Sequence, residues 1–200
     1  MTSKFPSIAS KLRNQGYRTG FIGKWHLGYS EESSANANGF DHYFDFNDWS
    51  IDYYSHKTFS GSSLYKNDSP IEAEGYITNV FTDNAIEFIN EQPSKPFFLS
   101  LFYNAPLPPL QIPGNPEDTR DKTTWGNSTR EDYIKVIENV DENIGRILND
   151  LKEKGYMKIQ LLFLLMIMED GLCKSRRTIP WFCNPLGRRH SRSIDNTTST

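Results

Sequence analysis

Apolar residues recur at the three- and four-residue spacing of one helix face in two long stretches of the sequence. The longer stretch covers residues 131–154, where Glu and Lys occupy much of the opposite face and Gly155 is a plausible C-terminal cap. The other stretch runs from Ile77 to Ile89 and is stopped by Pro93. The pattern predicts two amphipathic helices.

A shorter pattern precedes them near the N-terminus. Ile8 and Leu12 have helical spacing, and Gly16 is placed to end that helix. Residues 17–22 then have the character of a short strand. Residues 96–103 form an almost continuous apolar run, which is typical of a strand covered on both faces.

The order helix, strand, helix, strand, helix predicts an α/β layer architecture. Residues 28–75 are rich in Ser, Asn, Asp, Gly and Tyr, and we interpret them as long surface loops with one short strand at most. The loop at 104–116 opens after the apolar strand, a usual place for ligands in open α/β sheets. From Lys158 the character changes, which predicts one domain over residues 1–157 and a distinct tail over 158–200.

Composition narrows the classes of partner. The chain has 200 residues and a formal net charge of −3, which gives no reason to expect nucleic acid or an anionic membrane as partner. No apolar run is long enough to span a bilayer, and the N-terminus carries no secretory signal pattern. Two cysteines do not make a disulfide framework. Acceptor triplets for glycosylation begin at Asn67 and Asn127 and permit a secretory route.

Lys24 and His26 are the chemistry-bearing pair. In an extended segment, residues two apart project toward the same side, so an ammonium and an imidazole would together form a compact anion site. Gly23 and Gly28 permit tight turns around them. The alternative is a surface lysine and a half-buried histidine at a strand end, and the spacing alone favours that alternative.

The surrounding sequence changes this weighing. Residues 12–28, LRNQGYRTGFIGKWHLG, closely resemble the second signature of the sulfatase family, and residues 38–44 are similar to the element that follows it. Residues 96–113 resemble the family's strand and "H-x-PLQ-x-P" loop, and residues 132–155 resemble a family helix. The resemblance covers roughly residues 6–157 and is greatest to arylsulfatases of the type-B-like group.

This resemblance implies a partial alkaline-phosphatase-like fold, with a mainly parallel sheet flanked by helices. It implies a sulfuric ester hydrolase that uses a formylglycine nucleophile and a calcium ion. Lys24 would bind a sulfate oxygen, and His26 would be catalytic, contacting the formylglycine hydroxyls and helping to release sulfate. The implied substrate is a sulfate-ester small molecule or glycan, and the implied location is the secretory pathway, lysosomal or extracellular.

Two departures from the family pattern argue against activity. The formylglycine motif Cys/Ser-x-Pro-x-Arg is absent from the sequence, as is the early Asp pair that binds metal, so we expect a fragment. The near-matches at Cys173 and Cys183 lie on the wrong side of Lys24 and are read as chance. The histidine of the "H-x-PLQ" loop falls on Leu107, and leucine can neither bind sulfate nor pass a proton.

A third departure lies in the tail. The family requires Asp-Asn-Gly after the long helix, where this chain has Met166-Ile167-Met168-Glu169-Asp170. Codons for these residues, read from the third base of each codon, can spell Asp-Asn-Gly. We hypothesise a frameshift near Lys158, which the nucleotide sequence would test. A divergent natural C-terminus is the alternative.

Three functional hypotheses follow. The first is an arylsulfatase-like hydrolase that is incomplete and inactive as this chain. The second is a non-catalytic remnant or pseudoenzyme that binds an anion or a partner chain. The third is a phosphoesterase of the same superfold, against which Trp25-His26-Leu27 argues.

Overall fold

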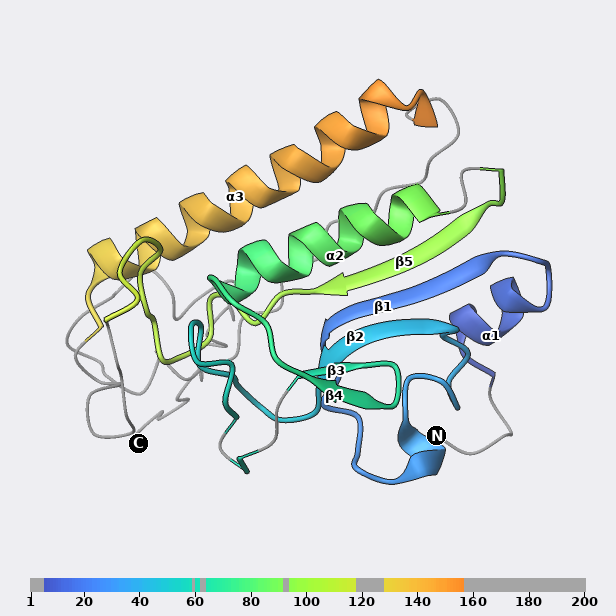
Figure 1. Ribbon diagram of the computed structural model, residues 1–200, viewed down its shortest axis with the longest axis horizontal. Helices are drawn as coiled ribbons and strands as arrows, with labels where there is room; N and C mark the ends of the chain where they lie inside the picture. The colour runs from blue at the N-terminus through green and yellow to red at the C-terminus, as the bar shows by residue number, and fades with distance from the viewer. Residues whose placement is uncertain (1–5, 59, 62–63, 92–93, 118–127, 157–200) are drawn as a thin grey trace, which may run out of the picture. The chain divides into compact units, whose positions relative to one another are not determined.

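Five strands form one mixed sheet in the computed structural model, which describes residues 6–58, 60–61, 64–91, 94–117 and 128–156 (Figure 1). The order across the sheet is β4-β3-β2-β1-β5. The central strand β1 is parallel to both β2 and β5, whereas β3 and β4 pair antiparallel at one edge. The strands are β1 (Arg18–Lys24), β2 (His42–Phe46), β3 (Leu64–Lys66), β4 (Ser69–Ile71) and β5 (Phe97–Phe102).

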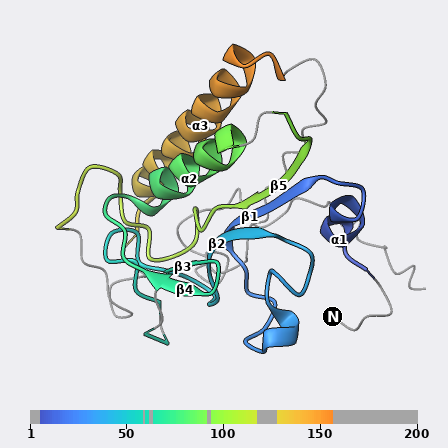
Figure 2. The same cartoon turned by 45° about the vertical axis from the view of Figure 1, so that its right-hand side comes forward.

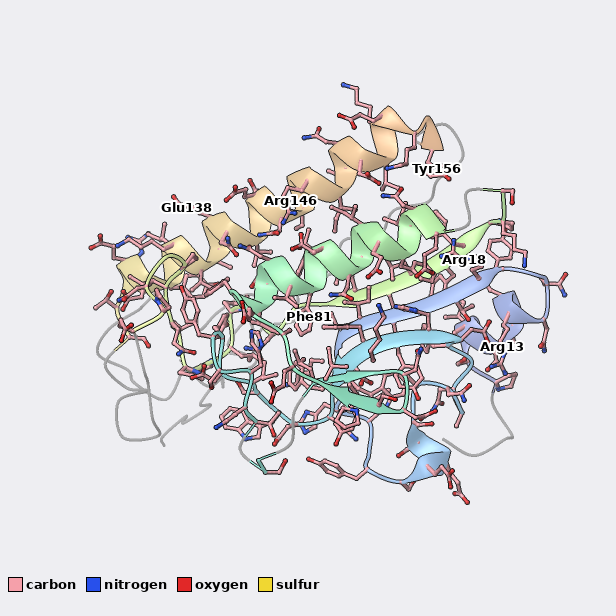
Figure 3. The ribbon with its side chains drawn as sticks, viewed as in Figure 1. Arg13, Arg18, Phe81, Glu138, Arg146 and Tyr156 are labelled. Atoms are coloured by element: carbon pink, nitrogen blue, oxygen red, sulfur yellow. The ribbon has the colours of Figure 1, made fainter. Side chains whose placement is uncertain are left out.

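Helices α2 (Ile77–Glu91) and α3 (Arg130–Glu153) lie together over one face of the sheet (Figures 1 and 2). Phe81 of α2 faces the strands, and its ring centroid lies 6.0 Å from that of Phe44 and 6.2 Å from that of Phe46 (Figure 3). Burial of these aromatic rings fixes α2 on the sheet. Arg146 of α3 bonds to Asp83 of α2 and ties the two helices.

The short helix α1 (Ile8–Arg13) packs on the opposite face. Alternate residues of a strand point to opposite faces, so Tyr43 of β2 faces away from the Phe44 side. Tyr43 joins an aromatic core there with Phe21 of β1 and Ala9 of α1. The parallel part of the sheet therefore carries a hydrophobic layer on each face. The remaining members of this core are Trp25, Ala35 and Phe40.

The three predicted helices are confirmed. Gly16 and Gly155 follow α1 and α3 with φ of +86° and +74°, the left-handed conformation that glycine adopts readily. Thr129 caps α3 through a capping box with Asp132. Pro93 lies outside the described residues, and so does the predicted tail. No helix in the described ranges is long and apolar enough to cross a membrane.

Two interpretations of the sequence were wrong. Residues 28–75 hold three strands, not one at most, because β3 and β4 span only three residues each and are too short to show a period. Another short element there is a 3-10 turn, η1 (Glu31–Ser33). The second concerns β5. The strand itself is confirmed, but it is not fully covered on both faces, since its residues are only half-buried and Phe102 is exposed. Within the described residues, only β1 pairs with β5, so this strand forms an edge.

Candidate active site

The carboxyl ends of β1, β2 and β5 share one edge of the sheet because these strands are parallel. Lys24 ends β1, Asn47 follows β2, and Asn104 follows β5 after one intervening residue. Ligands in open α/β sheets bind outside this edge. The predicted site residues therefore lie where a ligand site is expected.

Gly23 sets the position of Lys24. It has a φ of +109°, and a Cβ atom built on it would lie 1.8 Å from the carbonyl oxygen of Phe102 in β5. No side chain fits at that separation, so only glycine lets β1 and β5 approach this closely. The glycine of this motif is thus a requirement of the backbone.

Trp25 anchors the turn that follows the strand. Its indole N–H donates to the carbonyl of Ser33 over 2.7 Å, and its backbone N–H donates to the carbonyl of Phe46 over 3.0 Å. Its ring meets those of Phe21 and Phe40 edge-on, with centroids 4.8 and 5.9 Å away. The buried indole fixes the backbone on which Lys24 and His26 stand.

Lys24 is half-buried and His26 is exposed. The strand ends at Lys24, and His26 has a φ of +39°, a left-handed conformation that is uncommon outside glycine. The prediction of an extended segment is therefore wrong beyond Trp25, and the alternation rule does not apply to His26. Lys24 is thus the last residue of β1, and His26 follows it in the segment where the chain leaves the strand.

Asn47 ties this turn to β2. Its side-chain amide donates to the carbonyl of Gly28, which has a φ of +127°. Its Oδ1 is buried and, within the described residues, accepts no hydrogen bond. The segment from Lys24 to Ser30, called the Lys24 turn below, is therefore held at both ends.

Gln111 joins the loop after β5 to the loop after β2. Its Oε1 accepts from the backbone N–H of Tyr53 over 2.8 Å, and its Nε2 donates to Asp52 Oδ2 over 2.9 Å. Its own carbonyl accepts from the Tyr76 hydroxyl over 2.8 Å. The side chain is 1% exposed, so each of these bonds forms away from bulk water. We call residues Asp52, Tyr53, Asn104, Leu107 and Gln111 the Gln111 clasp.

Leu107 lies inside this clasp with its backbone held from two sides. Its N–H donates to the Asn104 carbonyl over 2.9 Å, and its carbonyl accepts from the Tyr53 hydroxyl over 2.9 Å. Burial raises the pKa of Tyr53, so this hydroxyl stays a donor. The backbone of the loop is thus hydrogen-bonded on both sides of Leu107, whose half-buried side chain has no polar atom.

Sequence reasoning missed Asp45 of β2. It is 7% exposed and lies beside Gly23 in the register of β1 and β2. Burial, followed by the charge of Asp68, raises its pKa to about 7. The Tyr43 hydroxyl donates to Asp68. The only sequence signal was an acid inside the apolar run His42–Phe46, which typically marks a buried carboxyl group.

The implied cofactors do not fit the residues that the structure describes. In those ranges, no three His, Cys, Asp or Glu side chains gather where they could hold a metal ion. Cys173 and Cys183 lie outside the described residues.

Comparison with known proteins finds sulfatases. The family model for sulfatases matches residues 2–165. The chain is 30% identical over 169 residues to the uncharacterized sulfatase YdeN of Escherichia coli K12, covering 72% of this chain and 29% of that protein. It is 31% identical over 160 residues to arylsulfatase J of Mus musculus, covering 75% and 26%. The chain thus spans less than a third of these curated relatives.

Solved structures agree. The crystal structure of Ps i-CgsB in complex with k-i-k-neocarrahexaose is 27% identical, with a TM-score of 0.63. The superposition covers 74% of this chain and 36% of that one. The predicted α/β fold of the alkaline-phosphatase type is therefore confirmed.

Proposed function

The chain belongs to the sulfatase family, and from this premise we propose that it forms the sulfate-binding part of a sulfuric ester hydrolase of the arylsulfatase type. The observation that carries the proposal is the Lys24 turn. Lys24 lies at the carboxyl end of β1 and His26 follows two residues later, on a backbone held by Gly23 and Trp25.

Lys24 would bind one oxygen of the sulfate group. An ammonium is a compact charge suited to a tetrahedral oxyanion, and half-burial strengthens the attraction by lowering the local dielectric constant. His26 would donate a second hydrogen bond to the same anion, since its exposed ring is open to a ligand. In the complete reaction this imidazole would be catalytic, assisting departure of the sulfate.

The family reaction hydrolyses a sulfate monoester to sulfate and an alcohol or phenol. In a complete family member, formylglycine would supply the nucleophile and calcium would polarise the sulfate. Among the described residues, no three His, Cys, Asp or Glu side chains gather to hold a metal ion. We propose that this chain binds the anion but does not turn over the ester, because Leu107 supplies no imidazole and no Cys/Ser-x-Pro-x-Arg sequence occurs in it.

A hydrolysis assay tests this proposal. Purified chain is incubated with 4-nitrophenyl sulfate, and release of 4-nitrophenol is followed by absorbance. We expect no release above the buffer rate. Hydrolysis that disappears in the Lys24→Ala variant would show that the chain is active and overturn the proposed inactivity.

A non-catalytic sulfatase remnant or pseudoenzyme is the second candidate function. The intact Gln111 clasp favours it, because the loop around Leu107 keeps its hydrogen bonds although the imidazole is gone. Saturable sulfate binding without turnover is the result that this candidate predicts. Tighter binding of phosphate monoesters than of sulfate monoesters would instead favour a phosphoesterase.

The ligand class and the cellular location are also parts of this proposal. One similar protein was crystallised with a carrahexaose oligosaccharide, so we propose a sulfated glycan or small sulfate ester as the ligand class. We also propose a secretory, lysosomal or extracellular route, with the glycosylation triplets at Asn67 and Asn127 as its sequence support. Mass analysis of the protein secreted from a eukaryotic host would test for glycans at these positions.

A further inference from the structure

Large apolar side chains are exposed at few places in the described part of the chain, and two of these places lie in the Lys24 turn. Leu27 is 54% exposed and Tyr29 is 72% exposed. Leu27 directly follows His26, and Tyr29 lies five residues after Lys24. The remaining exposed apolar residues are Ile8, Phe102 and Ile134.

The backbone that carries Leu27 and Tyr29 is well tied. Asn47 bonds the carbonyl of Gly28, which lies between the two residues. A Cβ atom at Gly28 would lie 2.6 Å from Ser33 Oγ, so the turn is packed closely against the segment that follows it. Ser33 Oγ also donates to the carbonyl of Ser30 over 2.8 Å. Leu27 and Tyr29 are therefore exposed on a loop whose backbone is held in place by hydrogen bonds and close packing.

We propose that Leu27 and Tyr29 form an apolar rim that binds the ring carrying the sulfate ester, while Lys24 and His26 bind the sulfate group. This inference rests on the proposed function, because the position of the ring is deduced from the proposed position of the sulfate group. The ring of a sulfate ester begins within a few bonds of sulfur, so it must lie against residues adjacent to the anion site. Leu27 and Tyr29 are those residues along the turn.

The chemistry of the rim identifies the ligand class. Ligand sites combine apolar and aromatic side chains with a few polar groups that fix orientation. A tyrosine offers a flat apolar face and a hydroxyl at its tip, and the leucine adds a purely apolar neighbour. This combination suits a ring with one apolar face, whether the C–H face of a pyranose or the face of a phenyl group. The anion provides the charge recognition and the rim selects for a ring.

The test measures ring binding separately from sulfate binding. Isothermal titration calorimetry on the full chain uses three probes: inorganic sulfate, N-acetylglucosamine 6-sulfate and 4-nitrophenyl sulfate. For Tyr29→Ala we expect affinity for the two ring probes to fall about tenfold, with inorganic sulfate unchanged within about twofold. Tyr29→Phe keeps the ring and should retain the binding of both ring probes. A smaller loss is expected for Leu27→Ala.

Ile8→Ala is the matched control, since Ile8 is 64% exposed but lies in α1, which precedes the opposite end of β1 (Figure 1). It should leave all three affinities unchanged. The two ring probes separate the sugar from the aryl source, and a loss with either one supports the rim. Unchanged ring-probe affinity in Tyr29→Ala, or an equal loss with inorganic sulfate, would overturn the rim.

The experiment distinguishes failure of the proposed sulfate site from failure of the apolar rim. If Lys24→Ala leaves inorganic sulfate binding unchanged, the anion site is wrong, whereas the effect of Tyr29→Ala on the ring probes relative to inorganic sulfate still decides the rim. Absence of binding by the wild-type chain to all three probes would overturn both proposals. Circular dichroism of each variant confirms that the fold is retained.

Discussion

The Lys24 turn and the Gln111 clasp lie at the same edge of the sheet but are built differently. The turn presents exposed side chains, His26, Leu27 and Tyr29, on a backbone fixed from behind. In the clasp, Gln111 and Asn104 are each 1% exposed and hydrogen-bonded to the neighbouring loop. The Lys24 turn therefore carries an ammonium and an imidazole, whereas the hydrogen bonds of the Gln111 clasp surround Leu107, which has no polar side-chain atom. Loop geometry and loop chemistry are separable properties in this molecule.

Gly23→Ala should have the largest effect on stability. The added Cβ would meet the Phe102 carbonyl at 1.8 Å on a residue with a φ of +109°, so β1 and β5 must separate. We expect a loss of more than ~4 kcal/mol in the free energy of unfolding, measured by urea denaturation. Gly145→Ala is the control, because Gly145 lies in α3 with no atom near its Cβ position. A loss below ~1 kcal/mol for Gly23→Ala would contradict the close approach of the two strands.

Asp45→Asn should alter how stability depends on pH. Because the folded state raises this pKa from 3.8 to about 7, the folded chain holds a proton that the unfolded chain releases. Stability should therefore fall as pH rises from about 4 to 7, by up to ~4 kcal/mol for about three pKa units. Asparagine removes this dependence, so the advantage of the variant over wild type should grow with pH and level off above 7.

Unfolding of both chains at pH 4, 6 and 8 measures this difference. Asp141→Asn is the control, because Asp141 lies exposed on α3. Parallel stability profiles for wild type and Asp45→Asn across this range would show that Asp45 is ionised in the folded state.

Gln111→Ala should destabilise the clasp. It removes the partner of the Tyr53 amide and of Asp52, and it leaves a buried cavity. We expect a loss of about 3 kcal/mol in the free energy of unfolding. Gln15→Ala, at an exposed position after α1, should change it by less than ~0.5 kcal/mol. Equal effects of the two substitutions would mean that Gln111 does not hold the loops together.

Leu107→His should have the smallest effect on the free energy of unfolding, and it should increase the affinity for sulfate. The backbone of Leu107 is already held by Asn104 and Tyr53, so the new side chain should cost less than ~1.5 kcal/mol. A histidine there adds a donor for an anion, and sulfate should bind a few-fold more tightly by calorimetry. Unchanged sulfate affinity, with the fold retained, would separate the clasp from the anion site.

Local patterns in the sequence predicted the helices and the position of Lys24. The apolar stripe of α3 involves neighbours three and four residues apart, so a single stretch of sequence shows it. Strands β3 and β4 escaped detection because they are short and partly polar. The Gln111 clasp was not predictable, because Gln111 and its partner Tyr53 lie 58 residues apart. The left-handed backbone of His26 was not predicted, because non-glycine residues rarely adopt a positive φ.

Calorimetric titration of the purified chain with sodium sulfate, alongside Lys24→Ala, tests the central claim that the Lys24 turn is a sulfate-binding site. Urea denaturation of both proteins checks that the variant keeps the fold, since Lys24 lies at the end of β1 and outside the aromatic core. We expect saturable binding by the wild-type chain and a loss of at least about tenfold in affinity in the variant. Binding that is absent from the wild type, or equal in the two proteins, would contradict it.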